Sequence, residues 1–234
     1  MATPSLLLLV ADGRFPAGAH AHSGGLEAAV AAGRVTDLAT LEEFLAGRLA
    51  TAGLVGAAFA AAAHRAAVSG SAGADEAARL SMLAQLDAEL DARTAAPTLR
   101  EVSRRQGRAL LRAGRTIWPD APFGDLPATP GGVHQPLVLG LLCAAAGLSR
   151  LDTATVAAYG TVTGAASAGV RLLGLDPYRV QALLVGLADA CDGTAAEAAR
   201  AADGPPERLP AAAAPLADIH AEIHATWEVR LFAS

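Results

Sequence analysis

Two pairs of histidines have the residue type and the spacing to hold a metal ion. His20 and His22 are two residues apart, and His220 and His224 are four apart, which would place both imidazoles on one face of a helix. Glu222 lies between the second pair, whereas the zinc-protease motif HExxH has its glutamate directly after the first histidine. Two histidines alone do not make a tight site, so hydrogen-bonded or partly exposed histidines are expected. The alternative is a metal-dependent hydrolase that uses His220 and His224.

The stretch FPAGAHAHSGGLE, from Phe15 to Glu27, raises the question of phosphate binding. It is rich in glycine and precedes a predicted helix, and a helix N-terminus favours anions. A phosphate-binding P-loop also needs a lysine, but all 18 basic residues of this chain are arginine. Schiff-base chemistry is excluded for the same reason. The stretch is therefore expected to be a shaped loop, and the chain is not expected to hydrolyse a nucleotide by itself.

A third candidate for chemistry is a run of arginines. The run consists of Arg100, Arg104, Arg105, Arg108, Arg112 and Arg115. Such a face could hold phosphates, but the segment lacks the aromatic residues on which bases stack, and the chain has a net charge of −5. We expect a solvated face with some ion pairs, including one between Glu101 and Arg105, and no nucleic-acid partner. A nucleic-acid binder using this face remains a weaker alternative.

Composition points to helices as the elements that must position these residues. Of the 234 residues, 53% are hydrophobic, many of them alanine, while 4% are aromatic. Nothing alternates with period two over the length of a strand. The expected fold is all-α: one compact domain over residues 1–234, a bundle of roughly nine or ten helices, with a short tail at 230–234.

Local signals place several helix boundaries. Starts are expected at Thr3-Pro4, near Ser23, at Thr36 or Asp37, at Pro97, at Asp152 or Thr153, at Asp176-Pro177 and at Pro215. Residues 69–74 (SGSAGA) predict a turn, and the proline-rich segment 118–136 predicts a long loop.

The cysteines and the apolar segments indicate the cellular location. Cys143 and Cys191 lie far apart in apolar surroundings, as expected of small buried residues in a reducing compartment. No basic region precedes the leucines at 6–9, and no other apolar run has the length and composition of a membrane span. A cytoplasmic protein without a membrane partner is expected. Residue chemistry alone therefore stops at a binding module or scaffold without an evident active site.

The segment LLLLVADGRFPAGAHAHSGGLEAAV resembles the N-terminal signature of the urease accessory protein F (UreF) family. The matching residues are Asp12, Pro16, Gly18, His22, Ser23, Gly25, Leu26 and Glu27. Further segments resemble family landmarks in the right order: REVSRRQGRALL (100–111), HQPLVLGLL (134–142), AGVRLLGL (168–175) and the terminal RLFAS (230–234). The resemblance therefore spans the whole chain.

This resemblance implies a non-catalytic maturation factor that is all-α and forms a homodimer. Its implied partners are the accessory protein called D or H, the GTPase UreG and apo-urease, to which the assembly delivers nickel. It implies no catalytic residue, cofactor or metal ligand in this chain. The residues expected to face partners are Pro16, Gly18, His20, His22, Ser23, Gly25, Glu27, Arg171, Arg230, Leu231, Phe232 and Ser234.

Two points of this resemblance lead to specific expectations. Where the family has an aromatic residue, this chain has His20, which keeps a flat ring and adds a titratable nitrogen. The tail is expected to dock beside the N-terminal loop, on its own subunit or a partner, by burying Leu231 and Phe232 and by offering Arg230 to a carboxylate. Ser23 could cap the helix that holds Glu27, and a purely structural role remains open for Pro16, Gly25 and Glu27.

Overall fold

A computed structural model describes residues 4–16, 21–70, 76–121, 123, 126 and 129–232. Within these ranges every regular element is helical, which confirms the all-α expectation. The α-helices are α1 (Pro4–Ala11), α2 (Leu26–Ala31), α3 (Leu38–Arg48), α4 (Leu54–Gly70), α5 (Glu76–Arg93), α6 (Pro97–Ile117), α7 (Gln135–Ala145), α8 (Arg150–Leu173), α9 (Pro177–Gly186), α10 (Ala188–Ala201) and α11 (Pro215–Ala225).

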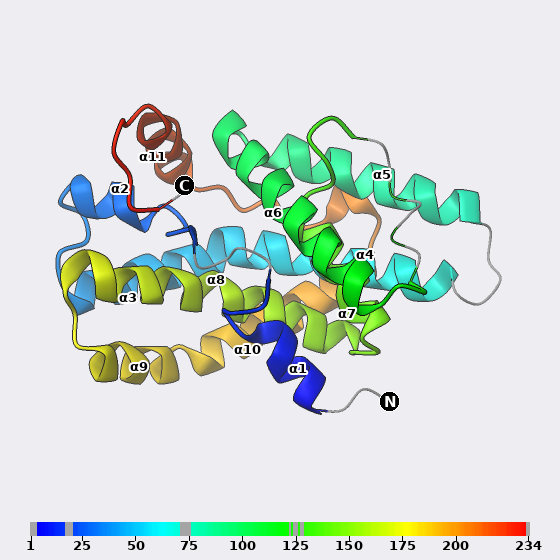
Figure 1. Cartoon of the computed structure of the whole chain (residues 1–234), viewed down its shortest axis with the longest axis horizontal. Helices are drawn as coiled ribbons and strands as arrows, with labels where there is room; N and C mark the ends of the chain where they lie inside the picture. Colours follow the sequence, from blue (N-terminus) through cyan, green and yellow to red (C-terminus); the bar gives the residue numbers. More distant parts are fainter. Residues whose placement is uncertain are drawn as a thin grey trace.

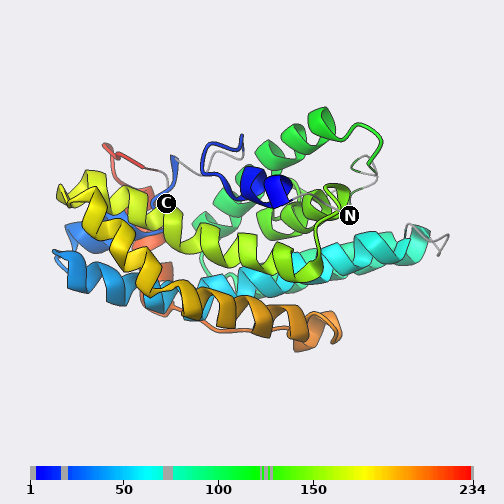
Figure 2. The same ribbon diagram turned by 90° about the horizontal axis from the view of Figure 1, so that it is seen from below.

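Helix α4 is the centre of the bundle and continues α3 through a π-helical stretch, Leu49–Gly53. The two helices follow one another along the length of the molecule (Figure 2), and α4 packs against α5, α7, α8 and α10. Ala57 to His64 are all buried, because the helix is covered on every side. A chain this rich in alanine forms such a helix readily, and the small side chains let its neighbours approach closely.

The closest approach to α4 is made by α7. A side chain added at Gly140 would collide with the backbone of α4 at Ala60 and with the amide of His64. The α7 residues from Leu137 to Cys143 are buried almost without interruption, as expected for the nearly all-apolar segment at 134–148. This contact fixes the position of α7, and with it that of the loop that leads into α7.

Several predicted helix starts are confirmed by their caps. Asp37 accepts a hydrogen bond from the Thr40 amide at 2.9 Å, and Asp176 accepts one from the Tyr178 amide at 2.9 Å. The prediction for α8 was wrong: this helix begins at Arg150 and not at Asp152 or Thr153. Ser149 is its cap, and the Asp152 carboxylate accepts a hydrogen bond from the Ser149 amide at 2.9 Å. The aspartate that suggested a start is thus the second half of a reciprocal capping pair.

Two other boundaries also differ from expectation. Helix α2 begins at Leu26 and not near Ser23, because Gly24 and Gly25 adopt the left-handed conformation, with φ of +62° and +88°. A second helix start, at Ala188 of α10, was not predicted: it follows Leu187 directly after α9 ends at Gly186. The turn expected at 69–74 lies largely outside the described residues, and the described part of the loop 118–134 contains no helix.

One end of the molecule brings together α2 and the C-terminal part of the chain. Helix α11 lies beside α2 and near the start of α6, and the chain after α11 passes over α2 (Figure 1). The side chain of Glu222 on α11 accepts a hydrogen bond from the Thr98 amide of α6 at 2.8 Å. This carboxylate serves as the cap that α6 lacks in its own sequence.

The combined α3–α4 helix is long and apolar enough, at residues 38–69, to pass a length-and-hydropathy test for a membrane span. Half of its most apolar window is buried inside the bundle. Core helices of globular proteins pass the same test, and the packing of α4 on four neighbouring helices accounts for its composition.

Candidate functional site

The signature segment 15–27 approaches the bundle as a loop that ends on α2. Phe15 is buried and Pro16 is exposed at the start of the segment, while His22 is half-buried near its end. Gly18 and His20, both predicted to face partners, lie outside the described residues. Among the described residues of the segment, the buried polar residues are Ser23 and Glu27.

Glu27 is the centre of the site. Its Oε1 accepts a hydrogen bond from the Leu231 amide at 2.8 Å, and its Oε2 accepts one from the Phe232 amide at 3.0 Å. The Nε2 of His224, on α11, lies 3.0 Å from Oε2. One carboxylate of the N-terminal signature therefore holds the C-terminal tail by its backbone and α11 by a side chain.

Burial raises the pKa of the Glu27 carboxyl, but its hydrogen bonds outweigh that effect. The Leu231 amide, the His224 ring and the Phe232 amide together leave this pKa below its ordinary value. Glu27 is therefore ionised at neutral pH. With an ionised acceptor, the His224 nitrogen that faces it carries the proton and donates.

Two residues hold the loop that presents Glu27. The Ser23 hydroxyl accepts a hydrogen bond from the Glu27 amide at 3.3 Å, so the expected capping by Ser23 is found, although Gly25 occupies the formal cap position. Arg48, at the end of α3, donates to the Gly24 carbonyl oxygen. A side chain at Gly24 would meet the Arg48 guanidinium at 2.8 Å, so this close approach requires glycine.

The tail is attached to α8 as well as to α2. Phe232 is buried, and the guanidinium carbon of Arg171, in the last turn of α8, lies 4.3 Å from the centre of its ring. The expectation that the tail docks beside the N-terminal loop is confirmed, and it does so on its own chain. The expectation that the Leu231 side chain is buried was wrong. This side chain is 74% exposed, because the backbone of Leu231 makes the contact.

Arg230, the remaining described residue among the predicted tail contacts, does not join this cluster. Arg230 is exposed and forms no ion pair within the part of the chain that the structure describes, and Ser234 lies outside that part. Leu231 and Val229, which is 84% exposed, therefore project outward from a backbone that Glu27 fixes. The arrangement can bind and present a surface.

Two residues of this cluster were not assigned to it from the sequence. His224 was noticed only as a metal candidate, and Arg48 was not considered. No local pattern links either residue to the signature, since Glu27 and His224 are 197 positions apart. The available signal was indirect: a histidine in a helix close to a terminal motif.

The metal alternative is not supported. His224 is buried and bound to Glu27, whereas His220 is half-buried, so the two imidazoles do not form a common open site. Among the described residues, no group of three or more histidine, cysteine or acidic side chains could hold a metal ion. The hydrolase built on His220 and His224 is therefore withdrawn.

The prediction that the arginine-rich helix is a solvated face was only partly right. Arg104 turns inward, where it donates to Asp87 at 3.0 Å and to Asp91 at 2.7 Å. Arg100 donates to the backbone carbonyl oxygen of Thr94 at 2.6 Å. The reason is that α5, the connection from α5 to α6 and the loop before α7 supply acceptors for these side chains, which helix periodicity alone cannot predict. The expected pair between Glu101 and Arg105 is present at 3.7 Å, on the exposed side.

A second buried network lies where α5, α6 and α7 meet. The Nδ1 of His134 lies 3.0 Å from the Ser103 hydroxyl, and its Nε2 lies 3.1 Å from Asp91. The three residue types are those of a hydrolase triad. However, His134 has no exposed surface, and the Ser103 hydroxyl also accepts the Gln135 amide at 3.3 Å. This network therefore serves to join helices, because the His134 ring is fully buried and the Ser103 hydroxyl is engaged by both the His134 ring and the Gln135 amide.

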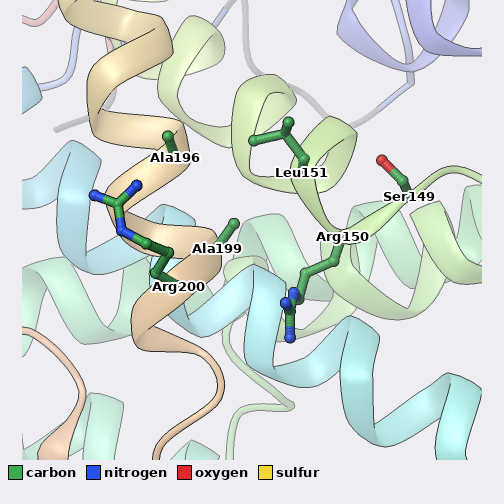
Figure 3. Close-up of a pocket in the computed structure, with 6 residues that line it drawn as sticks. All are labelled: Ser149, Arg150, Leu151, Ala196, Ala199 and Arg200. Atoms are coloured by element: carbon green, nitrogen blue, oxygen red, sulfur yellow. The ribbon is translucent and has the colours of Figure 1, made fainter.

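A pocket lies elsewhere, between the start of α8 and the end of α10 (Figure 3). It has a volume of about 380 Å³ and is lined by Ser149, Arg150, Leu151, Ala196, Ala199 and Arg200. Ser149 is occupied as a helix cap, and Arg150 is paired with Asp203. No histidine, cysteine or carboxylate lines this pocket, so it brings no set of catalytic groups together.

Comparison with known proteins gives the same family throughout. The UreF family model matches residues 35–188. The urease accessory protein UreF of Mycolicibacterium vanbaalenii is 43% identical over 234 residues, and that of Mycobacterium marinum is 44% identical over 234 residues; both alignments cover 100% of each chain. The urease accessory protein UreF of Mycobacterium tuberculosis H37Rv is 44% identical over 198 residues, which is 85% of this chain and 86% of that one. The signature and the tail lie outside the range of the family model but inside the two full-length alignments.

Proposed function

Because the chain belongs to the UreF family of urease accessory proteins, we propose that it is a non-catalytic scaffold which recruits the GTPase UreG together with the UreD/UreH-type partner. This scaffold supports GTP-dependent delivery of nickel to apo-urease. At the coarser level the assignment is direct: the chain is an accessory protein of urease maturation and belongs to a family of accessory proteins, not of enzymes. The lysine-free sequence agrees with a GTPase activity that belongs to a partner.

The observation that carries this proposal is the bond between Glu27 and the tail. The N-terminal signature and the C-terminal tail both resemble segments of the family. One carboxylate and two backbone amides join them. A buried carboxylate whose partners are two backbone amides and one histidine ring fixes the shape of a surface. We assign this combined surface to GTPase recruitment, with Pro16, Gly18, His20, His22, Arg230 and Ser234 as further contact residues and with Ser23, Gly25, Glu27, Arg171 and Phe232 holding its shape.

Helix α11 supplies a second surface, suited to the UreD/UreH-type partner. Its apolar face consists of Leu216, Ile219 and Ile223, which are 44%, 56% and 52% exposed and follow a spacing of three and four residues. Val229 and Leu231 extend this apolar surface into the tail. Exposed apolar groups that gather in one place are typical of sites that another protein covers. Since α11 also holds His224, a partner on this face would stabilise the tail.

The remaining parts of the proposal follow from the family alone. A homodimer and a cytoplasmic location are expected of an accessory protein that works on a cytoplasmic enzyme. His20 replaces the aromatic residue of the family signature within the assigned GTPase surface.

The test is removal of the tail. A chain that lacks residues 230–234 is expected to bind the UreD/UreH-type partner but to lose capture of UreG in the presence of GTP, with unchanged helicity by circular dichroism. The double substitution Ile219→Ser and Ile223→Ser is expected to weaken binding of the UreD/UreH-type partner instead. Leu8→Ser with Leu9→Ser, on the exposed side of α1, is the matched control. Unchanged capture of UreG by the shortened chain would refute the proposal.

A further inference from the structure

The arginines of α6 divide into two sets with different roles. Arg100 and Arg104 are used inside the molecule, as described above, and Arg104 keeps only 11% of its side chain exposed. The other set, here called the arginine stripe, faces outward and consists of Arg105, Arg108, Arg112 and Arg115. Its spacings of three, four and three residues place the four side chains on one face, over about 15 Å of helix.

Among the residues that the structure describes, little charge compensates the arginine stripe. Arg108 donates to the Gly131 carbonyl oxygen, and Arg115 donates to the Phe123 carbonyl oxygen at 3.0 Å. Carbonyl oxygens satisfy hydrogen bonds but carry no net charge. Within the described ranges, Arg105 is the only member that forms an ion pair, at 3.7 Å with Glu101, and both side chains are more than half exposed. Such an exposed, loose pair neutralises little.

The charge of the arginine stripe is therefore opposite in sign to the net charge of the whole chain. The net charge is −5, yet one helix face carries four cations for one weakly paired carboxylate. Like charges three and four residues apart on a helix repel one another and destabilise the free protein. The carbonyl contacts hold two of the guanidinium groups in place, so the charges are presented in a fixed pattern.

We propose that the arginine stripe of α6 is a docking surface for an acidic protein face of a partner in urease maturation. The occupant is a protein surface with at least two carboxylates along a helix or strand, because fixed guanidinium groups bind carboxylates in bidentate pairs. The proposal rests on the proposed function for the identity of the assembly. It adds a surface that is distinct from the α11 apolar face and from the tail.

The position of the stripe supports a protein partner over a nucleic acid. Helix α6 begins beside α11, where Glu222 caps it, and then crosses the front of the molecule (Figure 1). A protein bound to the α11 apolar face can therefore continue onto the stripe. No aromatic side chain of α6 itself could stack on a base, since the helix from Pro97 to Ile117 has none.

The experiment measures association rates of the full chain with the UreD/UreH-type partner, UreG and apo-urease, one at a time. The salt concentration is varied from about 0.01 M to about 1 M, which reduces the screening length from about 30 Å to about 3 Å. The double variant Arg105→Gln and Arg112→Gln removes two charges without loss of a carbonyl contact. Arg34→Gln with Arg179→Gln is the matched control, because it changes the net charge equally at two exposed arginines elsewhere.

At low salt, the stripe variant is expected to associate with one partner about tenfold more slowly and to lose most of its salt dependence, whereas the control keeps both. Its melting temperature is expected to stay the same or to rise, because repulsion is relieved. A fall of melting temperature and binding together would overturn the proposal in favour of a structural role. Retention of RNA or duplex DNA by the wild type but not by the variant, with unchanged protein binding, would also overturn it.

The two proposals fail in different ways. If the wild-type chain binds none of the three proteins, both fail. If the wild type binds its partners and the stripe variant binds them at the same rate at every salt concentration, only the assignment of the stripe fails.

Discussion

Two buried histidine–carboxylate networks hold different parts of this molecule, and they are built differently. The first, here called the core network, joins Asp87, Asp91, Arg104 and His134 from three helices of the bundle. The second, here called the tail latch, joins Glu27 and His224 to the backbone of Leu231 and Phe232. The core network contains a permanent cation, whereas the tail latch relies on amides and one imidazole.

The difference indicates which contacts can be released. Arg104 and Asp87 are both nearly buried, so separation of their charges would leave one of them unpaired inside the protein. The tail latch holds a segment whose outward side chains are mostly exposed, and its opening uncovers little apolar surface besides Phe232. Local opening is cheapest where few buried apolar contacts are lost. The core network should therefore fail only with the whole fold, and the tail latch should open by itself.

The largest effect is expected from Asp87→Ala. Asp87 accepts the His134 amide at 3.0 Å and the Arg104 guanidinium at 3.0 Å, so its removal leaves a buried amide and a partly unpaired cation. We expect a loss of about 3–5 kcal/mol in the free energy of unfolding, measured by urea denaturation. Asp91→Ala, at a side chain that is 41% exposed, is the control and should cost less. Equal losses for the two variants would contradict the ranking.

A smaller and local effect is expected from Glu27→Gln. The amide keeps one acceptor oxygen but loses the charge, so the hydrogen bonds from the Leu231 and Phe232 amides weaken. We expect their hydrogen-exchange protection to fall by the equivalent of about 1–3 kcal/mol, while global unfolding changes little.

Glu228→Gln, at an exposed carboxylate near the tail, is the control for this prediction. A loss of global stability as large as that of Asp87→Ala would show that the tail latch is part of the core and not a separate unit.

The dependence on pH should separate the two networks. Burial and the nearby charge of Arg104 lower the pKa of His134 from its ordinary value of 6.5, and burial also lowers the pKa of His64 from 6.5. A lowered histidine pKa contributes stability that is present above the unfolded value and is lost as pH falls through the folded value. The free energy of unfolding should therefore decline below about pH 6.5.

The tail latch should respond only at lower pH. The pKa of Glu27 lies below its ordinary value of 4.5, so its stabilisation is present above about 4.5 and is lost as pH falls through the folded-state value. As pH falls from about 6.5 to about 4.5, the free energy of unfolding should decrease. Over the same range, the hydrogen-exchange protection of the Leu231 and Phe232 amides, corrected for intrinsic rates, should stay constant. Loss of that protection at pH 6 would be the opposite result.

The sequence was informative where a signal is local. Asp37, Asp176 and Pro215 marked helix starts correctly, because caps and N1 prolines act within one turn. The composition predicted the fold class for a similar reason, since alanine favours helices wherever it occurs. The docking of the tail beside the signature was anticipated from the family resemblance and not from residue chemistry.

The sequence was uninformative where a side chain depends on its neighbours in space. Arg104 and Arg105 are adjacent and chemically identical, yet one is buried against α5 and the other is exposed. Periodicity assigns a face to each residue but does not say which helix covers that face. The same limit applies to His224: its spacing from His220 suggested a metal, whereas its actual partner comes from α2.

The smallest expected effect concerns the other contact of the tail. The Arg171 guanidinium lies over the Phe232 ring, 4.3 Å from its centre. Arg171 is exposed, so water weakens the interaction. Arg171→Gln should reduce protection of the Phe232 amide by about 0.5–1 kcal/mol, less than Glu27→Gln does. In a Phe232→Leu background the ring is absent, and the effect of Arg171→Gln on the tail should be smaller than in the wild type. An undiminished effect there would show that the contact with the ring contributes little, and an effect larger than that of Glu27→Gln would move the centre of the tail latch from α2 to α8.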